Sequence, residues 1–394
     1  MDPRRNPFAP GAGSKPPELA GRDAVIERLA IALDRIRSGR SDRGVIFYGL
    51  RGVGKTVLLN RIRLDAEARG FATVPIEAPE GRSLPGILVP TLRATLLKLS
   101  RGEAVRAGLK RAMRALAGFA NALKVKYGDI EVGMDFPAEK GIADSGDLEI
   151  DLADLLMAAG EAAVEKKTAL VLFIDELQYV PREQLAALIA ALHKVHQNDK
   201  PVTMAAAGLP QLLGQMGKAK SYAERLFEFV EIGNLDRDAA KAALTKPVKG
   251  EGVRYTDEAL DAILDATSGY PYFLQEWGKH CWDVAESSPI ERADVEKAAR
   301  AAIAELDASF FRVRFDRLTP AEKRYLRAMA ELGPGPHRSG DIAEIMKKPV
   351  TSVAPIRNAL VRKGMIYSLA HGDNAFTVPL FDGFMRRIMP KLPY

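Results

Sequence analysis

Eight consecutive residues, from Gly49 to Thr56, have the types and spacing of a phosphate-binding loop. The run Gly-Leu-Arg-Gly-Val-Gly-Lys-Thr matches the pattern G-x-x-x-x-G-K-[ST] in full. Glycines let such a loop curl tightly, so that backbone N–H groups point at phosphate oxygens. We expect Lys55 to reach the β- and γ-phosphates of ATP and the Thr56 hydroxyl to coordinate Mg²⁺. The predicted nucleotide contacts are Gly49, Leu50, Arg51, Gly52, Val53, Gly54, Lys55, Thr56 and Val57.

A second group of chemical residues follows an apolar run much later in the chain. Leu170 to Ile174 is unbroken and ends at Asp175-Glu176. A buried strand would carry both acids to the carboxyl edge of a sheet, beside the phosphate loop. There Asp175 would hold Mg²⁺ and Glu176 would orient the attacking water. The alternative is a strand end whose acids cap the next helix.

A hydrolysing site of this kind also needs a positive group near the γ-phosphate. Arg225 stands just before another apolar run, where it could reach the site of a neighbouring subunit. We weigh this equally against a surface arginine paired with Glu224 or Glu228. If Arg225 acts in this way, the chain forms a homo-oligomer with ATP.

The elements that must position these residues form an alternating pattern. Apolar runs at 45–48, 71–76, 169–174, 202–207 and 227–232 predict strands, and stretches with helical periodicity lie between them. Strands that alternate with helices predict an α/β fold, a parallel P-loop NTPase sheet covered on both faces.

After Asn234 the pattern is helical only, and a third pattern starts near Arg312. Three predicted helices and a small hairpin there describe a winged helix. Its third helix, Val350 to Lys363, is the expected recognition helix, with Arg357, Arg362 and Lys363 exposed and Lys347 and Lys348 before it. The expected domains are a flexible tail at 1–17, an ATPase domain at 18–235 with an insertion at about 101–146, a helical lid at 236–305 and a winged helix at 306–394.

Charge and composition restrict the kinds of partner that the chain is expected to bind. The net charge is +6, and residues 318–394 alone carry 12 Lys/Arg against 6 Asp/Glu, which accounts for all of it. A basic C-terminal domain favours a polyanion such as double-stranded DNA. Within the insertion, Arg106, Lys110 and Arg114 form a second basic stripe.

No apolar run is long enough to span a bilayer. Cys281 is the sole cysteine, so a reducing cytoplasm is the expected location.

Together these residues resemble the AAA+ ATPases of the origin-recognition and initiator type. Leu19-Ala20-Gly21-Arg22-Asp23 looks like the Gly-Arg-acid box that such proteins place beside the adenine, so the resemblance implies that Gly21 and Arg22 contact the nucleotide. The order of P-loop domain, helical lid and winged helix is similar too. The resemblance implies an ATP-hydrolysing switch associated with DNA, of the initiator or mobile-element helper type.

One departure points to a different group. Initiator lids offer an arginine to the phosphates, whereas the matching place here reads Thr267-Ser268-Gly269-Tyr270-Pro271. This Gly-x-Pro pattern is similar to the lid of STAND signalling NTPases, which implies that Pro271 lies against the nucleotide and that hydrolysis is slow. A STAND-like switch, whose winged helix packs or binds a protein partner, therefore remains the alternative.

Overall fold

A five-stranded parallel sheet forms the centre of the N-terminal domain. The computed structural model describes residues 1–11, 14, 16–100, 107–130, 137–138, 140–368 and 372–392. The strands are β1 (Gly44–Tyr48), β2 (Ala72–Glu77), β3 (Leu170–Asp175), β4 (Val202–Gly208) and β5 (Phe227–Glu231), in the order β2-β3-β4-β1-β5. All neighbouring strands are parallel. The five predicted strands are confirmed.

Alternating side chains of the strands build two cores, one on each face. Val45 and Phe47 of β1 pack with α1 (Asp23–Arg37) and α2 (Lys55–Ala68), whereas Ile46 points to the opposite face. That face is covered by α3 (Leu84–Leu99), α5 (Leu148–Glu165), α6 (Arg182–Gln197), α7 (Leu212–Ala219) and the short α8 (Ala223–Leu226). The predicted α/β architecture is confirmed, and the acid-bearing β3 is separated from β1 by β4.

The predicted insertion contributes one described helix, α4 (Ala107–Leu123), which packs on α3 and α5. Its apolar face, including Leu116 and Phe119, is fully buried. Lys110 and Arg114 are exposed on the other face, and Arg106 lies outside the described residues. The helix therefore adds a layer to the sheet, and the role of its basic face stays a prediction.

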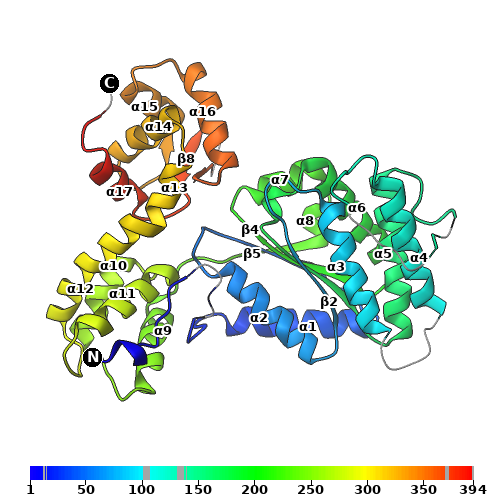
Figure 1. Ribbon diagram of the computed structural model, residues 1–394, viewed down its shortest axis with the longest axis horizontal. Helices are drawn as coiled ribbons and strands as arrows, with labels where there is room; N and C mark the ends of the chain where they lie inside the picture. Colours follow the sequence, from blue (N-terminus) through cyan, green and yellow to red (C-terminus); the bar gives the residue numbers. More distant parts are fainter. Residues whose placement is uncertain are drawn as a thin grey trace.

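Four lid helices follow the sheet: α9 (Arg237–Lys249), α10 (Asp257–Thr267), α11 (Pro271–Val284) and α12 (Arg292–Glu305). The last continues through a π-helical segment, η3 (Leu306–Phe311), into α13 (Arg312–Asp316). This arm runs from the lid into the C-terminal domain (Figure 1). Among the described residues, no helix combines the length and apolar character needed to cross a bilayer.

The prediction of a flexible tail at 1–17 is wrong for its first 11 residues. They contain a 3₁₀ turn, η1 (Pro3–Arg5), and dock on the lid, beside which the N-terminus lies (Figure 1). Phe8 is only 4% exposed and covers Gly278, where an added Cβ would meet its ring at 2.8 Å. The Asn6 amide donates to the Lys279 carbonyl at 3.1 Å. The buried Phe8 ring and the hydrogen bonds to the lid hold a segment whose Pro- and Gly-rich composition alone favours disorder.

The C-terminal domain has the predicted winged-helix arrangement. Its elements are α14 (Pro320–Glu331), β6 (His337–Arg338), α15 (Ser339–Ile345), α16 (Val350–Arg362), β7 (Ile366–Tyr367), β8 (Asp373–Phe376) and α17 (Phe381–Ile388). Thr319 and Glu322 form a reciprocal capping box at the start of α14. The small antiparallel sheet has the order β6-β8-β7, so the wing has one strand more than the predicted hairpin, and α17 is a further addition.

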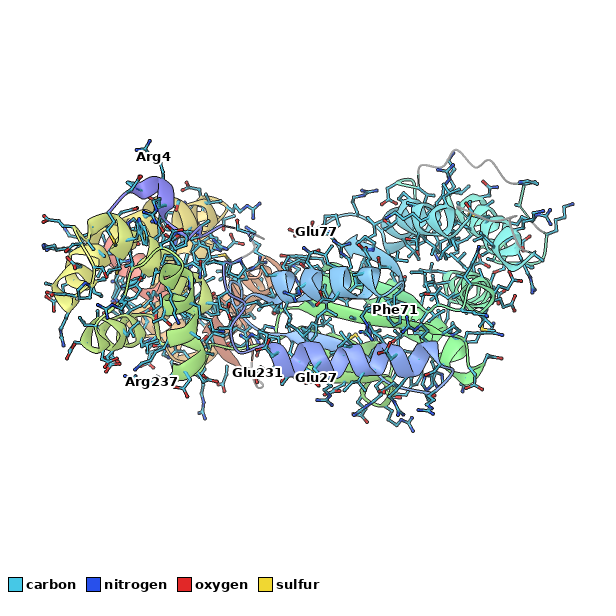
Figure 2. All side chains as sticks on the ribbon, turned by 90° about the horizontal axis from the view of Figure 1, so that it is seen from below. Arg4, Glu27, Phe71, Glu77, Glu231 and Arg237 are labelled. Atoms are coloured by element: carbon cyan, nitrogen blue, oxygen red, sulfur yellow. The ribbon has the colours of Figure 1, made fainter. Side chains whose placement is uncertain are left out.

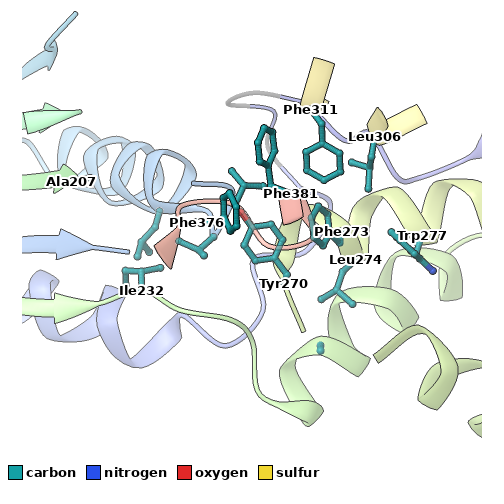
Figure 3. Close-up of a cluster of buried hydrophobic side chains, with 14 of the residues drawn as sticks. Ala207, Ile232, Tyr270, Phe273, Leu274, Trp277, Leu306, Phe311, Phe376 and Phe381 are labelled. Carbon is teal, nitrogen blue, oxygen red and sulfur yellow. The ribbon is translucent and has the colours of Figure 1, made fainter. Parts of the chain in front are cut away.

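Apolar packing joins the three parts of the chain. Figure 2 shows two lobes, with Glu231 at the end of β5 near their junction and Arg237 on the lid. One continuous cluster runs from Ile232 beside the sheet, through Tyr270 and Phe273 of the lid, to Phe376 and Phe381 of the winged helix (Figure 3). The winged helix is thus packed against both other parts.

Candidate nucleotide site

A cavity of about 460 Å³ lies at the carboxyl end of the sheet, between the P-loop and the lid. The P-loop, the lid, α13 and the docked N-terminal segment all contribute to its wall. Its predicted site residues are Arg22, Arg51, Gly52, Val53, Gly54, Lys55, Thr56, Val57, Glu176 and Pro271. Gly49, Leu50 and Gly21 stand directly beside these residues in the chain. The structure therefore brings the P-loop, Glu176 and Arg22 to one cavity.

The P-loop glycines are required by their surroundings. Gly52 and Gly54 have φ of +83° and +91°, a left-handed region that disfavours other residues. A Cβ at Gly49 would collide with the Ile232 carbonyl oxygen. A Cβ at Gly52 would meet the Tyr270 hydroxyl at 2.7 Å, which shows how closely the lid approaches the loop. The loop leads directly into α2, whose N-terminal N–H groups favour an anion.

Lys55 is buried inside the curl of the loop. Its Nζ donates to the carbonyl oxygens of Gly49 at 3.0 Å and Leu50 at 2.7 Å. Burial lowers the pKa of Lys55 to about 8, and Arg51 adds to this, while Glu176 and Asp175 oppose it. A phosphate beside this ammonium would favour its charged form and raise the pKa.

Thr56 and Asp175 supply the hard oxygen atoms that Mg²⁺ prefers. The Thr56 hydroxyl is hydrogen-bonded to the Asp175 carboxylate, although the two residues lie on different elements. Burial, and then the neighbouring Glu176, raise the pKa of Asp175 despite that hydrogen bond. A divalent cation would remove this penalty because it favours the carboxylate. The donor set therefore fits Mg²⁺, and the assignment of both residues as its ligands stays a prediction.

Glu176 has an unusual backbone conformation, with φ of +55° directly after β3. Its carboxylate accepts a hydrogen bond from the amide of Gln178, in the 3₁₀ turn η2 (Leu177–Tyr179). The Gln178 oxygen in turn accepts the backbone N–H of Leu209 at 3.0 Å, at the end of β4. Glu176 is thus fixed toward the cavity by two neighbouring strands, a link that no local sequence pattern indicates.

The opposite end of the cavity is suited to a base. Leu19, Ala20, Leu235 and Leu274 line it. Arg22 is anchored there by donating to the Gly233 carbonyl at 2.5 Å, and burial lowers the pKa of its guanidinium.

The Gly-x-Pro motif closes the same wall. Gly269 has φ of +70° and packs on Leu235, whose N–H donates to the Gly269 carbonyl at 2.9 Å. Pro271 is the first residue of α11 and lines the cavity.

Arg225 does not join this site within one chain. It is exposed on α8, before Phe227, which pairs with Gly44 at the amino end of the sheet. The cavity lies at the carboxyl end. Within the described part of the chain Arg225 forms no ion pair, since Glu228 is paired with Arg28 instead. A role in the site of a neighbouring subunit stays a prediction.

The winged helix contacts the P-loop itself, an arrangement that no sequence motif indicates. The Arg51 N–H donates to the Thr377 carbonyl at 3.3 Å, and its Nε donates to the Gly364 carbonyl at 3.4 Å. Gly364 follows the last turn of α16. The Arg51 guanidinium also donates to the Tyr179 hydroxyl at 2.7 Å. One P-loop residue therefore bonds to both the winged helix and the turn that follows Glu176.

Two of the α16 residues expected to recognise DNA make bonds inside the winged-helix domain instead. The Arg357 Nε donates to Asn374 Oδ1 at 2.7 Å, inside the wing. The Lys363 Nζ pairs with Glu322 at 2.7 Å. The expectation that Arg357 and Lys363 are exposed and free to contact DNA is therefore wrong. The cause is tertiary: Asn374 is fully buried, and its amide oxygen needs a donor.

Comparisons with known proteins agree with this geometry. Residues 18–204 match the family model described as AAA ATPase domain, and residues 308–385 match a domain family of unknown function (DUF8462). The chain is 23% identical over 369 residues to an uncharacterised HTH-type transcriptional regulator of Methanocaldococcus jannaschii, covering 91% of this chain and 86% of that one.

Among solved structures, a Walker-type ATPase of Pyrococcus abyssi has a TM-score of 0.55 at 14% identity, over 93% of this chain and 96% of that one. The Orc1 protein of Aeropyrum pernix in complex with DNA has a TM-score of 0.47 at 16% identity, over 97% and 96%. The family match confirms an AAA ATPase domain over residues 18–204, and the Pyrococcus structure shows a shared fold.

Proposed function

Because residues 18–204 form an AAA ATPase domain, we propose that this chain binds and hydrolyses ATP and uses the nucleotide to control a winged helix that binds DNA. The P-loop N–H groups and Lys55 would hold the phosphates. Thr56 and Asp175 would hold Mg²⁺, which supplies charge neutralisation at the phosphates. Glu176, held by Gln178, would orient the water that attacks the γ-phosphorus, with release of ADP and phosphate.

The bonds between Arg51 and the winged helix carry the proposal of a switch. Its N–H and guanidinium both bond to carbonyl groups of that domain, at Thr377 and Gly364. A polyphosphate in the P-loop would attract the same guanidinium. Nucleotide and winged helix would then share one cation, so that the occupancy of the site would bias the position of α16.

A second surface supports DNA as the partner. Thr351, Pro355, Asn358 and Arg362 are exposed along one face of α16, and Lys347 and Lys348 are exposed in the turn before it. Among the described residues, this face has none of the internal bonds that occupy Arg357 and Lys363. The HTH-type description of the Methanocaldococcus relative is in line with this proposal. Lys347 and Lys348 would contact phosphates, and the α16 face would enter the major groove.

The STAND-like alternative is favoured by the lid. Gly269 is held in the left-handed region against Leu235, and Pro271 lines the cavity. In that case α16 would present the same exposed face to a protein. ATP binding is common to both functions, so they differ only in what the winged helix binds.

The ATPase part is tested with two substitutions. Lys55→Ala should abolish measurable ATP binding, since it removes the buried phosphate-facing cation. Glu176→Gln should keep ATP affinity within about threefold but slow phosphate release by about 100-fold or more, as it leaves every phosphate contact in place. Parent-like hydrolysis by Glu176→Gln would refute the role of that carboxylate. Lack of ATP binding by the parent protein would refute the function.

The DNA part is tested by gel shift of the full chain with ATP, with ADP and without nucleotide. Binding should depend on the nucleotide and fall steeply with salt. Replacing Lys347 and Lys348 with Ala should lower the slope of log K against log salt by about one for each lysine that touches a phosphate. Lys124 and Lys126, which are exposed and directly follow α4, provide a control pair, since α4 lies far from the winged helix (Figure 1). If no duplex binds at low salt in any nucleotide state, the STAND-like function is favoured.

A further inference from the structure

Arg314 is a cation in the nucleotide cavity that has no carboxylate partner within the described ranges. It lies on α13, half-buried, and lines the cavity with Phe310 and Tyr272. Its Nη1 donates to the Phe310 carbonyl at 2.5 Å, and its guanidinium lies 3.9 Å from the centre of the Phe310 ring. Arg51, among the same described residues, also forms no ion pair. Both guanidinium groups are instead fixed by neutral oxygen atoms and an aromatic face.

The charge of this cavity is unbalanced. Burial, and then the nearby Arg51, lower the pKa of Arg314 to about 10, so it stays charged at neutral pH. Lys55 and Arg22 add two further cations to the lining. Of the carboxylates in the wall, Glu18 is already paired with Lys246 at 2.7 Å, and Glu176 acts on Lys55, as Asp175 does. Asp236 acts on Arg22, so Arg51 and Arg314 are the two cations that these carboxylates leave unopposed. Burying like charges together is costly unless an anion neutralises them, and the cavity is therefore built for a multiply charged anion.

The position of Arg314 in the cavity indicates which part of the bound anion it contacts. The Phe310 ring beneath the Arg314 guanidinium stacks on Tyr272 with centroids 4.4 Å apart, and a Cβ at Gly52 of the P-loop would meet the Tyr272 Cβ at 3.2 Å. Arg51, in the same loop, is tied through Tyr179 to the turn after Glu176. The apolar residues suited to a base line the opposite end. Arg314 therefore faces the end where the terminal phosphate and the attacking water would lie. We propose that Arg314 binds the γ-phosphate of ATP, together with Arg51, and so makes the site prefer ATP over ADP.

Arg314 lies on the arm that joins the lid to the winged helix, so its contacts affect both parts. The lid helix α12 continues through the π-helical segment into α13 without a break, and π-helical turns often mark functional positions. Phe311, next to Phe310, packs on Phe381 and Phe384 of the winged helix with ring centroids 5.6 Å and 5.3 Å apart. A γ-phosphate held by Arg314 would thus hold the arm that enters the winged helix, and its loss would release that arm.

This inference rests on the proposed ATP binding. Equilibrium binding measurements distinguish a failure of the inference from a failure of the proposed function. We would titrate the full chain with Mg²⁺ and either ADP or adenosine 5′-(β,γ-imido)triphosphate, using calorimetry. Arg314→Gln should weaken binding of the triphosphate about 10- to 100-fold, the range expected for one lost hydrogen bond to a charged group. ADP affinity should change less than about threefold. Arg314→Lys, which keeps the charge, should recover part of the loss.

Arg312→Gln is the matched control, because Arg312 lies on the same helix but is exposed and paired with Asp316 at 3.1 Å. It should leave both affinities unchanged. Thermal unfolding of each variant identifies loss of fold, and Arg314→Lys then provides the test on its own, through its ratio of triphosphate to ADP affinity. Equal losses for both nucleotides, or no loss for either, would overturn the role of Arg314. Failure of the parent chain to bind either nucleotide would instead overturn the proposed function, and the inference with it.

Discussion

Gln178 gives a quantitative test of how Glu176 is positioned. Its side chain is only 7% exposed and makes two bonds, donating to the Glu176 carboxylate and accepting the Leu209 N–H at 3.0 Å. Gln178→Leu keeps the volume approximately but removes both. The Leu209 N–H then loses its partner inside the protein, which costs about 1–3 kcal/mol of folding free energy.

The effect on catalysis comes from the other bond. A hydrogen bond to a charged group contributes about 1.5–3 kcal/mol, and if it serves to orient the carboxylate, its loss slows hydrolysis about 10- to 100-fold. ATP affinity should stay within about threefold, because no phosphate contact is altered. The assay is steady-state phosphate release at saturating ATP, combined with direct measurement of nucleotide binding.

Gln184 provides a matched control. It is also 7% exposed and accepts one buried backbone N–H, that of Leu84 at 2.6 Å, but it lies on α6 and does not line the cavity. Gln184→Leu should lower the stability by a similar amount and leave turnover unchanged. If Gln178→Leu hydrolyses ATP at the parent rate, or if both variants lose turnover equally, the positioning argument is refuted.

Three further predictions concern charge, backbone and the wing. The lowered pKa of Lys55 means that nucleotide-free protein loses stability as the pH falls from about 10.5 to about 8, because only the unfolded chain takes up the proton there; ATP binding near pH 8 should take up a proton in calorimetry across buffers, and the uptake through Lys55 should fade well below pH 8, where Lys55 is already charged. Gly269→Ala should lower the melting temperature clearly more than Gly252→Ala, since both have positive φ but only Gly269 is packed against backbone. Arg357→Ala should destabilise the winged helix by about 1–3 kcal/mol, seen in denaturant unfolding, without changing DNA sequence preference.

Local patterns were sufficient for the sheet and the P-loop. Each strand is a short apolar run, and the alternation of Val45, Ile46 and Phe47 between two cores follows from the two-residue period of a strand. The P-loop motif and the acids after β3 are contiguous, so spacing alone predicts their chemistry. Parallel strands then bring their carboxyl ends to one edge whatever the strand order.

The features that the sequence did not predict all depend on packing between distant segments. Phe8 is a single aromatic in a segment of disordered composition, and its partner Gly278 lies on α11. The second bond of Gln178 requires β4 to lie beside β3, and strand order is not encoded in any one strand. Arg314 enters the cavity because the helical rod of α12 continues past the predicted end of the lid through η3 into α13. The aromatic pair Phe310-Phe311 just before it was the available signal, as two adjacent aromatics indicate burial there.

In both proposed functions, the nucleotide would first act on Arg51. Its guanidinium bonds to Gly364, two residues past the end of α16, and to Tyr179, in the 3₁₀ turn that follows Glu176. An anion bound beside Arg51 and Arg314 competes with the Gly364 carbonyl for this cation, since a charged acceptor binds a guanidinium more strongly than a neutral one does. Binding of a triphosphate would therefore loosen one hold on α16 while Arg314 tightens the arm from α12. We therefore expect the nucleotide to change how the winged helix is held, and the chemistry of the exposed α16 face to decide whether that change is read by DNA or by a protein.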